Sequence, residues 1–437
     1  MKYQKYNEYE DSKLSWLGKK PKHWKLYKLK YLVNRVHSKT IENGDNFRYV
    51  GLENIQSWKG KLEESYNYNP DSASNRFFKG DVLFGKLRPY LAKAFIAEFD
   101  GLCSSELLVL RTLKIDNKFL LYFLLSQNFI SIVDSSTYGS KMPRANWEFI
   151  SNLKLPLPNF REQQSISKFL DRETSRIDAL IEKKQKLIEL LKEKRTALIT
   201  KAVTKGLYSN VKMKDSGIEW LGEIPEHWDI IELKRLFKLY NGSTPSSNND
   251  EFWNGRLIWI TPDDLGKNNR KYINDSQRKI TYKGYQSCGT HLVPADSIII
   301  STRAPIGHIS LNSHKACTNQ GCKSLVPQKD EIISSYYYYY LYFSQKNLNS
   351  LGKGSTFMEL SANNLGKYIV PQLPVKEQKY IASYLDRETK KIDDLICKIE
   401  LAITKHKEYR TALISAAVTG KIKVPQEQKV HHEHADQ

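Results

Sequence analysis

The sequence predicts an α+β protein built as a pseudo-twofold tandem repeat, with two similar globular domains that are each followed by one long helix. Three observations predict this fold class. A tryptophan-containing nonapeptide occurs twice, a charged helical segment occurs twice, and the stretches before the two helical segments mix short β-rich runs with turn-rich sequence. Internal repeats of this kind dictate architecture, because each copy folds into a similar unit.

The repeat is clearest at two places. Trp16–Trp24 (WLGKKPKHW) recurs as Trp220–Trp228 (WLGEIPEHW), 204 residues later. The segment Arg161–Thr204 recurs as Lys376–Thr419, and 24 of the 44 aligned positions are identical. Two unrelated helices would not agree to this extent, so the chain consists of two tandem halves.

Each repeated helical segment carries a single apolar stripe. Ile and Leu recur at spacings of 3–4 and 7 with Lys, Glu and Arg between them, no Gly or Pro interrupts, and Gly206 and Gly420 follow the ends. This pattern is typical of a coiled coil. We expect the two stripes to bury each other; the alternative is that each helix packs on its own globular domain. The predicted seam residues are Ile166, Leu170, Ile177, Ile181, Ile188, Leu191, Leu198, Ile381, Leu385, Ile392, Ile396, Ile403 and Leu413.

The predicted organisation has six segments. They are an N-terminal arm with the first globular domain (1–158), the first long helix (159–206), a linker with the second nonapeptide (207–228), the second globular domain (229–373), the second long helix (374–421) and a flexible tail (422–437). The globular domains resemble each other strongly at their ends and weakly in their middles. They therefore predict a common fold with different surfaces.

The composition predicts a polyanionic partner. The formal net charge is +20, and neutralising phosphates with Lys and Arg releases counterions and adds affinity. The five cysteines are scattered without a C-x-x-C pair, so neither a disulfide framework nor a zinc site is expected, and a reducing cytoplasm fits. No apolar run reaches the ~20 residues that span a bilayer, and the N-terminus has no secretory h-region, so no membrane association is expected.

Basic, amide and hydroxyl residues gather in the variable parts of the globular domains. Arg reads guanine edges and Asn or Gln reads adenine, whereas Lys, Ser and Thr more often hold phosphates. Each position taken alone is better explained as a solvated surface side chain, and only their clustering in the variable domains favours DNA binding. The candidate DNA-binding residues are Asn75, Lys86, Arg88, Lys93, Lys141, Arg144, Ser243, Thr244, Arg303, Asn319 and Gln320. The tyrosine run Tyr336–Tyr340 could stack on bases, but its alignment with an apolar helix of the first half favours a structural role.

No catalytic motif is found. A phosphate-binding loop, a dinucleotide fingerprint and the Asn-Pro-Pro-aromatic motif of adenine methyltransferases are all absent from the sequence. His23 and His227 lack Cys or carboxylate partners at metal-ligand spacing, so they are interpreted as packing residues. The sequence predicts no catalytic residue and no metal ligand.

These motifs together resemble the specificity subunits of type I restriction–modification enzymes. The resemblance covers essentially the whole chain and rests on the nonapeptides, the LDRET and RTALI blocks, Phe84–Tyr90 (FGKLRPY) and Thr302–Gly307 (TRAPIG). It implies two target-recognition domains that each recognise one half of a split site in double-stranded DNA. It also implies that the helices form an antiparallel coiled coil, which acts as a ruler and docks two modification subunits.

The resemblance implies no cofactor on this chain. The modification subunits would carry S-adenosylmethionine and methylate adenine, and restriction motor-nuclease subunits would use ATP and magnesium. Two other interpretations remain open at this point. A self-contained DNA methyltransferase or nuclease would need a cofactor motif, and a coiled-coil scaffold would leave the charge of +20 unexplained.

Overall fold

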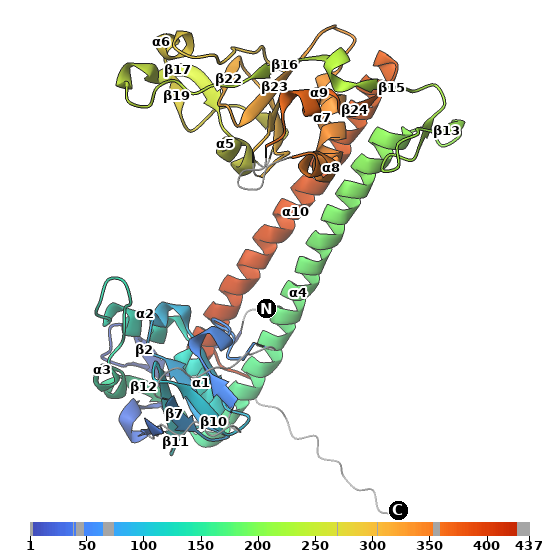
Figure 1. The fold of residues 1–437 in the computed structure, drawn as a ribbon. Coiled ribbons are helices and arrows are strands. Elements are labelled where there is room, and N and C mark those ends of the chain that lie inside the picture. Colours follow the sequence, from blue (N-terminus) through green and yellow to red (C-terminus); the bar gives the residue numbers. More distant parts are fainter. Residues whose placement is uncertain are drawn as a thin grey trace, which may run out of the picture. The chain divides into compact units, whose positions relative to one another are not determined.

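The computed structural model describes residues 3–37, 39–40, 48–63, 74–268, 270–303, 305–352 and 359–425. The chain forms two compact units (Figure 1). Unit 1 comprises residues 1–185 and 399–437, and unit 2 comprises residues 186–398. Among the residues described, no helix is both long enough and apolar enough to cross a membrane.

The boundary between the units falls inside both long helices. These are α4 (Phe160–Lys205) and α10 (Val375–Val418). Each unit therefore contains its own globular part together with a section of each helix. The sequence predicted the helices as separate segments between the domains, whereas the compact units share them.

The described residues of unit 1 form four sheets, ordered β1-β2, β5-β7-β10-β6, β4-β11-β8-β9 and β12-β3. Its strands are β1 (Tyr9–Asp11), β2 (Lys19–Pro21), β3 (Lys25–Lys28), β4 (Val33–Val36), β5 (Lys39–Thr40), β6 (Arg48–Val50), β7 (Ser74–Phe77), β8 (Val82–Gly85), β9 (Ala94–Ile96), β10 (Gly101–Ser104), β11 (Leu107–Thr112) and β12 (Lys154–Leu157). Its other helices are α1 (Asn117–Leu124), α2 (Gln127–Ser135) and α3 (Trp147–Asn152), with 3-10 turns η1 (Leu29–Tyr31), η2 (Leu52–Asn54) and η3 (Pro89–Leu91).

Unit 2 repeats this plan with sheets ordered β13-β14, β15-β24, β16-β23-β20-β21-β18 and β19-β17-β22. Its strands are β13 (Met213–Asp215), β14 (Glu223–Pro225), β15 (Asp229–Glu232), β16 (Phe237–Asn241), β17 (Trp253–Ile260), β18 (Tyr272–Ile273), β19 (Lys279–Ile280), β20 (Ile298–Ser301), β21 (Ile309–Asn312), β22 (Ala316–Thr318), β23 (Cys322–Pro327) and β24 (Ile369–Gln372). Its other helices are α5 (Pro262–Lys267), α6 (Tyr282–Gln286), α7 (Ser334–Phe343), α8 (Gln345–Ser350) and α9 (Ala362–Gly366), with 3-10 turns η4 (Leu233–Arg235) and η5 (Asp250–Phe252). The predicted α+β tandem repeat is confirmed.

The two long helices run antiparallel within each unit. In unit 1, Arg410 near the end of α10 forms an ion pair with Asp178 of α4, at 3.1 Å between Nε and Oδ1. In unit 2, Arg195 of α4 forms the repeat-equivalent pair with Asp393 of α10, also at 3.1 Å. Each helix thus contributes one arginine and one aspartate to the pairing, as pseudo-twofold symmetry requires.

The predicted seam divides into core residues and residues along the exposed length of the helices. Ile166, Leu170 and Leu413 belong to the hydrophobic core of unit 1, and Ile381 and Leu385 belong to that of unit 2. The seam therefore packs on the globular parts as well as helix to helix, so both packing modes considered from the sequence occur. Ile177, Leu191, Ile392 and Ile403 are buried as well, and Ile181, Ile188, Leu198 and Ile396 are half-buried.

The LDRET block anchors each long helix to the preceding short helix. In unit 1, Asp171 accepts a hydrogen bond from the Tyr122 hydroxyl at 2.7 Å. In unit 2, Asp386 accepts one from the Tyr339 hydroxyl at 2.7 Å and forms an ion pair with Lys271. Burial raises the pKa of Tyr122 and of Tyr339 well above the usual range, so both hydroxyls remain donors.

The tyrosine run has the structural role that its alignment favoured. All five rings of Tyr336–Tyr340 are buried. The Tyr336 hydroxyl donates to the carbonyl oxygen of Val203 at 3.0 Å, and the Tyr337 hydroxyl donates to that of Pro371 at 3.2 Å. Buried tyrosines with bonded hydroxyls add apolar area without leaving polar atoms unsatisfied. These rings offer no surface for base stacking.

Candidate nucleic-acid interface

His23 and His227 hold the repeated nonapeptides to the long helices. His23 Nε2 lies 3.0 Å from Oε2 of Glu162 in the first turn of α4, and His227 Nε2 lies 2.8 Å from Oε2 of Glu377 in the first turn of α10. Both carboxylates are about nine-tenths buried. The described residues contain no group of three or more His, Cys, Asp or Glu side chains that could hold a metal ion. His23 and His227, interpreted from the sequence as packing residues, are thus partly exposed partners of a buried carboxylate.

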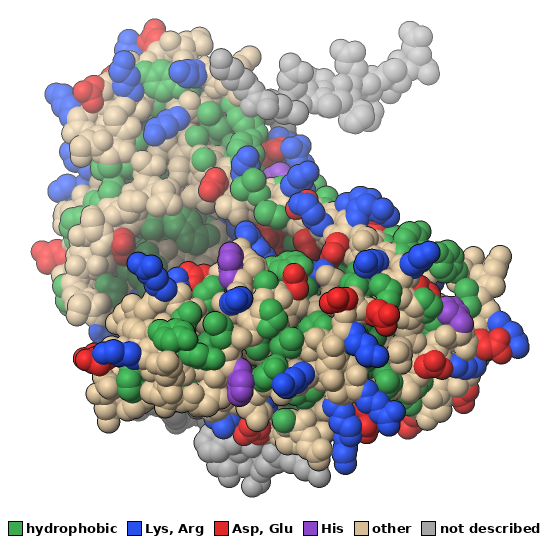
Figure 2. Space-filling model, turned by 90° about the horizontal axis from the view of Figure 1, so that it is seen from above, with side chains coloured by type: hydrophobic (Ala, Val, Ile, Leu, Met, Phe, Trp, Pro, Cys, Tyr) green, Lys and Arg blue, Asp and Glu red, His purple; other side chains and the backbone are tan. Residues whose placement is uncertain are grey.

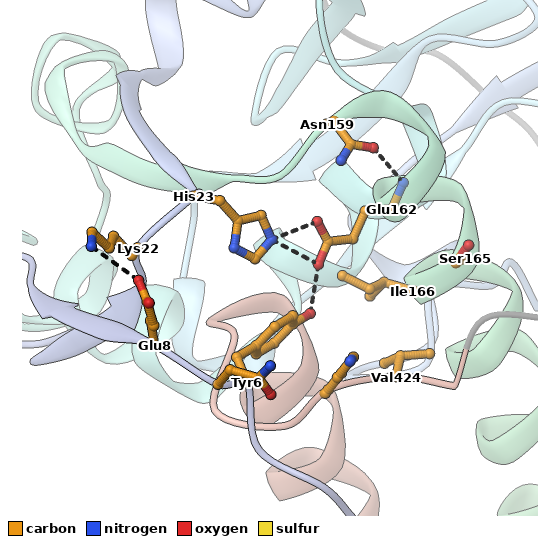
Figure 3. Close-up of a pocket in the computed structure, with 11 residues that line it drawn as sticks. Tyr6, Glu8, Lys22, His23, Asn159, Glu162, Ser165, Ile166 and Val424 are labelled. Carbon is orange, nitrogen blue, oxygen red and sulfur yellow. Dashed lines mark hydrogen bonds and ion pairs between the residues drawn. The ribbon is translucent and has the colours of Figure 1, made fainter.

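In unit 1 the same anchor also binds the N-terminal arm. Figure 3 shows Tyr6 and His23 converging on Glu162, at the wall of a cavity of about 530 Å³. The Tyr6 hydroxyl donates to Glu162 Oε1 at 2.7 Å, and Trp24 Nε1 donates to the same oxygen at 3.1 Å. Burial and the adjacent carboxylate raise the pKa of Tyr6 far above its usual range. The side chains that converge on the carboxylate are mutually satisfied, which indicates a structural anchor.

In unit 2, all five candidate residues meet at one place. A tight turn joins β22 to β23, with the Cys322 amide donating to the Asn319 carbonyl at 3.1 Å and the Gly321 amide donating to the Asn319 side chain at 3.0 Å. The Ser243 amide donates to the Thr318 carbonyl at 2.9 Å, which brings the loop after β16 against this turn. A Cβ on Gly242 would lie only 1.9 Å from the Asn319 carbonyl oxygen, so the loop and turn are packed without space between them.

A third and a fourth segment complete the arrangement. The Thr302 amide, just after β20, donates to the Gly321 carbonyl at 2.8 Å, and the Leu360 amide donates to the Thr302 carbonyl at 2.8 Å. Arg303 and Glu359 therefore face each other across an isolated β-bridge. We call residues 243–244, 302–303, 319–321 and 359–360 the unit 2 junction. Main-chain hydrogen bonds fix its frame.

The unit 2 junction presents hydroxyl, amide and guanidinium groups. Thr244 donates its hydroxyl to Oε1 of Gln320, and both side chains are exposed. Arg303 Nε donates to Oε2 of Glu359 at 3.3 Å, with 46% of the arginine side chain exposed. Asn319 is half-buried because its side chain closes the turn. Amides and guanidinium groups are the side chains that form bidentate hydrogen bonds with base edges.

Unit 1 has the same frame. The Lys86 amide, just after β8, donates to the Glu106 carbonyl at 3.0 Å, and the Ala145 amide donates to the Lys86 carbonyl at 2.9 Å. These bonds correspond to Thr302–Gly321 and Leu360–Thr302 in unit 2. We call residues 86–88, 104–106 and 143–145 the unit 1 junction. Arg144 Nε donates to both carboxylate oxygens of Glu106, at 3.1 and 3.2 Å.

Arg88 lies in a strained turn at this junction. Its φ of 51° is left-handed, and its amide donates to the Pro143 carbonyl at 2.8 Å. Ala92 closes the same 3-10 turn, also left-handed, with a φ of 46°. Non-glycine residues adopt this conformation only where the surroundings enforce it, and such strain gathers at functional sites. The Arg88 side chain is exposed.

Three other candidates stand apart from this arrangement. Lys93 donates its ammonium to the Leu52 carbonyl at 2.6 Å, so that ammonium already has an acceptor. Asn75 lies on β7, where it pairs with Cys103 of β10. Lys141 is exposed, two residues beyond the left-handed Gly139. The structure brings Lys86, Arg88 and Arg144 together. Asn75, Lys93 and Lys141 lie outside the frame.

Sequence reasoning missed the two carboxylates, Glu106 and Glu359. A search guided by positive charge passes over acidic residues, and both contacts join segments far apart in the chain. Lys and Arg side chains are also interspersed with Asp and Glu on the face that Figure 2 shows, without a single large basic patch. The signal that could have found the carboxylates is positional: Glu106 directly precedes the β-rich run Leu107–Leu110.

Comparisons with known proteins agree with this architecture. Two relatives come from Methanocaldococcus jannaschii. The chain is 28% identical to the putative type I restriction enzyme MjaX specificity subunit, across 95% of this chain and 97% of that protein. It is 34% identical to the type I restriction enzyme MjaIX specificity subunit, across 43% of this chain and 45% of that protein.

Solved structures share the fold. A chain from a structure on complex assembly and conformational transition of the type I R-M system superposes with a TM-score of 0.73 at 19% identity, covering 91% of this chain and 98% of that one. The HsdS subunit from Thermoanaerobacter tengcongensis superposes with a TM-score of 0.56 at 19% identity, covering 92% and 98%. The family model of the type I restriction modification DNA specificity domain matches twice, at residues 21–190 and 225–405. The chain therefore belongs to the type I restriction modification DNA specificity family.

Proposed function

We propose that the chain is the DNA sequence-specificity subunit of a type I restriction–modification complex and recognises a bipartite, asymmetric site in double-stranded DNA. The observation that carries the proposal is the pair of junctions. The same main-chain frame occurs in both units but presents different side chains, Arg144 with Glu106 in unit 1 and Gln320 with Thr244 in unit 2. Two different readers on equivalent frames suit two different half-sites.

In this proposal residues 1–158 and 229–373 contain the two target-recognition domains, and the chain performs no catalysis. Two modification subunits would dock on the long helices and bring S-adenosylmethionine, and restriction motor-nuclease subunits would bring ATP and magnesium. The chain would act in the cytoplasm, where its DNA target lies. Membership of the family supports this assignment.

Methylome sequencing tests the proposal directly. A host that carries the gene with its modification subunits is expected to show one methylated, split, non-palindromic motif that disappears when the gene is deleted. The purified chain alone is expected to neither methylate nor cut DNA. Robust methylation of DNA by the chain alone with S-adenosylmethionine would contradict the proposal. A methylation pattern that does not change when the gene is deleted would also contradict it.

A further inference from the structure

Each junction holds one guanidinium group against one carboxylate in the same manner. Arg144 binds Glu106 through Nε, and Arg303 binds Glu359 through Nε. The arginines differ in their place in the frame. The isolated bridge Leu87–Arg144 in unit 1 corresponds to Arg303–Glu359 in unit 2. Arginine thus lies on segment 143–145 in unit 1 and on the loop after β20 in unit 2. Its carboxylate partner lies in the turn before β11 in unit 1 and on segment 359–360 in unit 2.

The frame itself does not require these carboxylates. Glu106 and Gly321 occupy equivalent positions, since each accepts the same main-chain bond, from Lys86 and Thr302 respectively. Stability does not explain the pairs either. The side chains of Arg144 and Glu106 are 35% and 22% exposed, and those of Arg303 and Glu359 are 46% and 39% exposed, so solvent screens both attractions.

A carboxylate also repels the DNA backbone, so a carboxylate at a DNA-binding surface lowers affinity and is expected only where it has another role. The contact atoms indicate that role. A carboxylate on Nε fixes the plane of the guanidinium group and directs the terminal Nη1–Nη2 edge away from itself. That edge donates two parallel hydrogen bonds, which match the O6 and N7 acceptors of guanine in the major groove.

The geometry points to one guanine in each half-site, bound by Arg144 in unit 1 and by Arg303 in unit 2, with Glu106 and Glu359 as positioning residues. This inference rests on the proposed function and adds the base that each unit recognises. Glu106 and Glu359 determine specificity without touching DNA themselves, because they hold each arginine in the orientation that guanine requires.

The test uses the full chain assembled with its modification subunits, and DNA duplexes carrying the motif found by methylome sequencing. Each guanine is replaced in turn by 7-deazaguanine, which lacks the N7 acceptor. One replacement in each half-site is expected to weaken binding about 10-fold or more. Arg144→Lys keeps the charge but loses the forked guanidinium group. In this variant, 7-deazaguanine in one half-site is expected to weaken binding no further. In Arg303→Lys, the same is expected of 7-deazaguanine in the other half-site.

The carboxylates are tested with Glu106→Ala and Glu359→Ala. Each is expected to reduce discrimination at its own guanine about 10-fold, while affinity for unrelated DNA stays the same or rises because a negative charge is lost. A merely structural pair would lower both affinities together. Arg111→Lys is the matched control: Arg111 donates both Nε and Nη2 to Asp81, at 2.9 Å each, so one nitrogen of its terminal edge is already bound. Base preference is expected to be unchanged in this variant.

The possible failures are distinguishable. If the assembled complex recognises a split site but no guanine responds to 7-deazaguanine, or the alanine variants keep full discrimination, the guanine assignment is wrong and the proposed function stands. If the complex binds DNA without any sequence preference, both are overturned.

Discussion

The junctions of units 1 and 2 differ in chemistry but share their main-chain bonds. In unit 1, Arg144 binds the Glu106 carboxylate, and Lys86 and Arg88 belong to the same main-chain frame. In unit 2, the equivalent of Glu106 is glycine, and an amide–hydroxyl pair, Gln320 with Thr244, occupies the neighbouring turn. The unit 1 junction therefore presents mainly charged side chains, and the unit 2 junction presents both charged and uncharged polar side chains, on the same main-chain frame.

The two halves thus share the main-chain bonds that hold the junction and differ in the side chains that the junction presents. The shared part reaches into the helices, where Asp171 and Asp386 anchor equivalent tyrosines and Arg410 and Arg195 form equivalent ion pairs. The frame can therefore be tested separately from the side chains that it carries.

Exchange of one whole domain has the largest expected effect. Replacing residues 229–373 with the corresponding domain of a relative is expected to change one half-site completely and to leave the other unchanged. Methylome sequencing of the chimera measures both at once. An exchange of α10 alone serves as the control, since it should alter neither half-site. A chimera in which both half-sites change would break the assignment of one unit to one half-site.

A charge in the shared helical seam is expected to cost several kcal/mol in the free energy of unfolding. Leu191 is only 9% exposed, so Leu191→Asp buries an uncompensated carboxylate. The same change at the neighbouring Leu190, which is 49% exposed, is expected to cost under about 0.5 kcal/mol. Chemical denaturation of both variants gives the comparison. Leu191→Asp is also expected to lose co-purification with the modification subunits. Equal stabilities would show that the seam is not buried at this position.

The anchoring tyrosines are expected to contribute equally in the two units. Tyr122→Phe and Tyr339→Phe each remove a hydroxyl that donates to a carboxylate at 2.7 Å. A hydrogen bond to a charged group contributes about 1.5–3 kcal/mol, so we expect losses in that range for both variants. Thermal unfolding, followed at a tryptophan of each unit, measures them. A loss confined to one variant would mean that the two anchors are not equivalent.

The smallest expected effect concerns the one anchor that differs between units. Glu162 accepts hydrogen bonds from Tyr6 and Trp24 as well as from His23, whereas Trp228 Nε1 has no partner among the residues described. Glu162→Gln is therefore expected to destabilise the protein by about 1 kcal/mol more than the repeat-equivalent Glu377→Gln, because it weakens more donor contacts. Denaturation midpoints measure this difference. A larger loss for Glu377→Gln would reverse the assignment of the stronger anchor.

Much of the fold followed from sequence because repetition and apolar spacing are local properties. The two halves, the long helices and the burial of the tyrosine run could all be predicted from them. The convergence of Thr244, Arg303 and Gln320 could not, since it depends on the main-chain bonds from Ser243 to Thr318 and from Thr302 to Gly321, which join separate segments of the chain. The sequence also could not show that Lys93 is less available for DNA, because its ammonium group donates to the main-chain carbonyl of Leu52, which is distant in the chain.

The way the junctions are built bears on how such proteins diversify. The bonds from Lys86, Ala145, Thr302 and Leu360 need only a main-chain N–H, which every residue except proline supplies. The side chains of Ala145, Thr302 and Leu360 are themselves buried, but the exposed neighbours Arg88, Arg303 and Gln320 can change, or be replaced by recombination, without removing these bonds. A lineage under attack by new foreign DNA can thus acquire new targets from existing genes, one half-site at a time, while the scaffold and its inheritance stay intact.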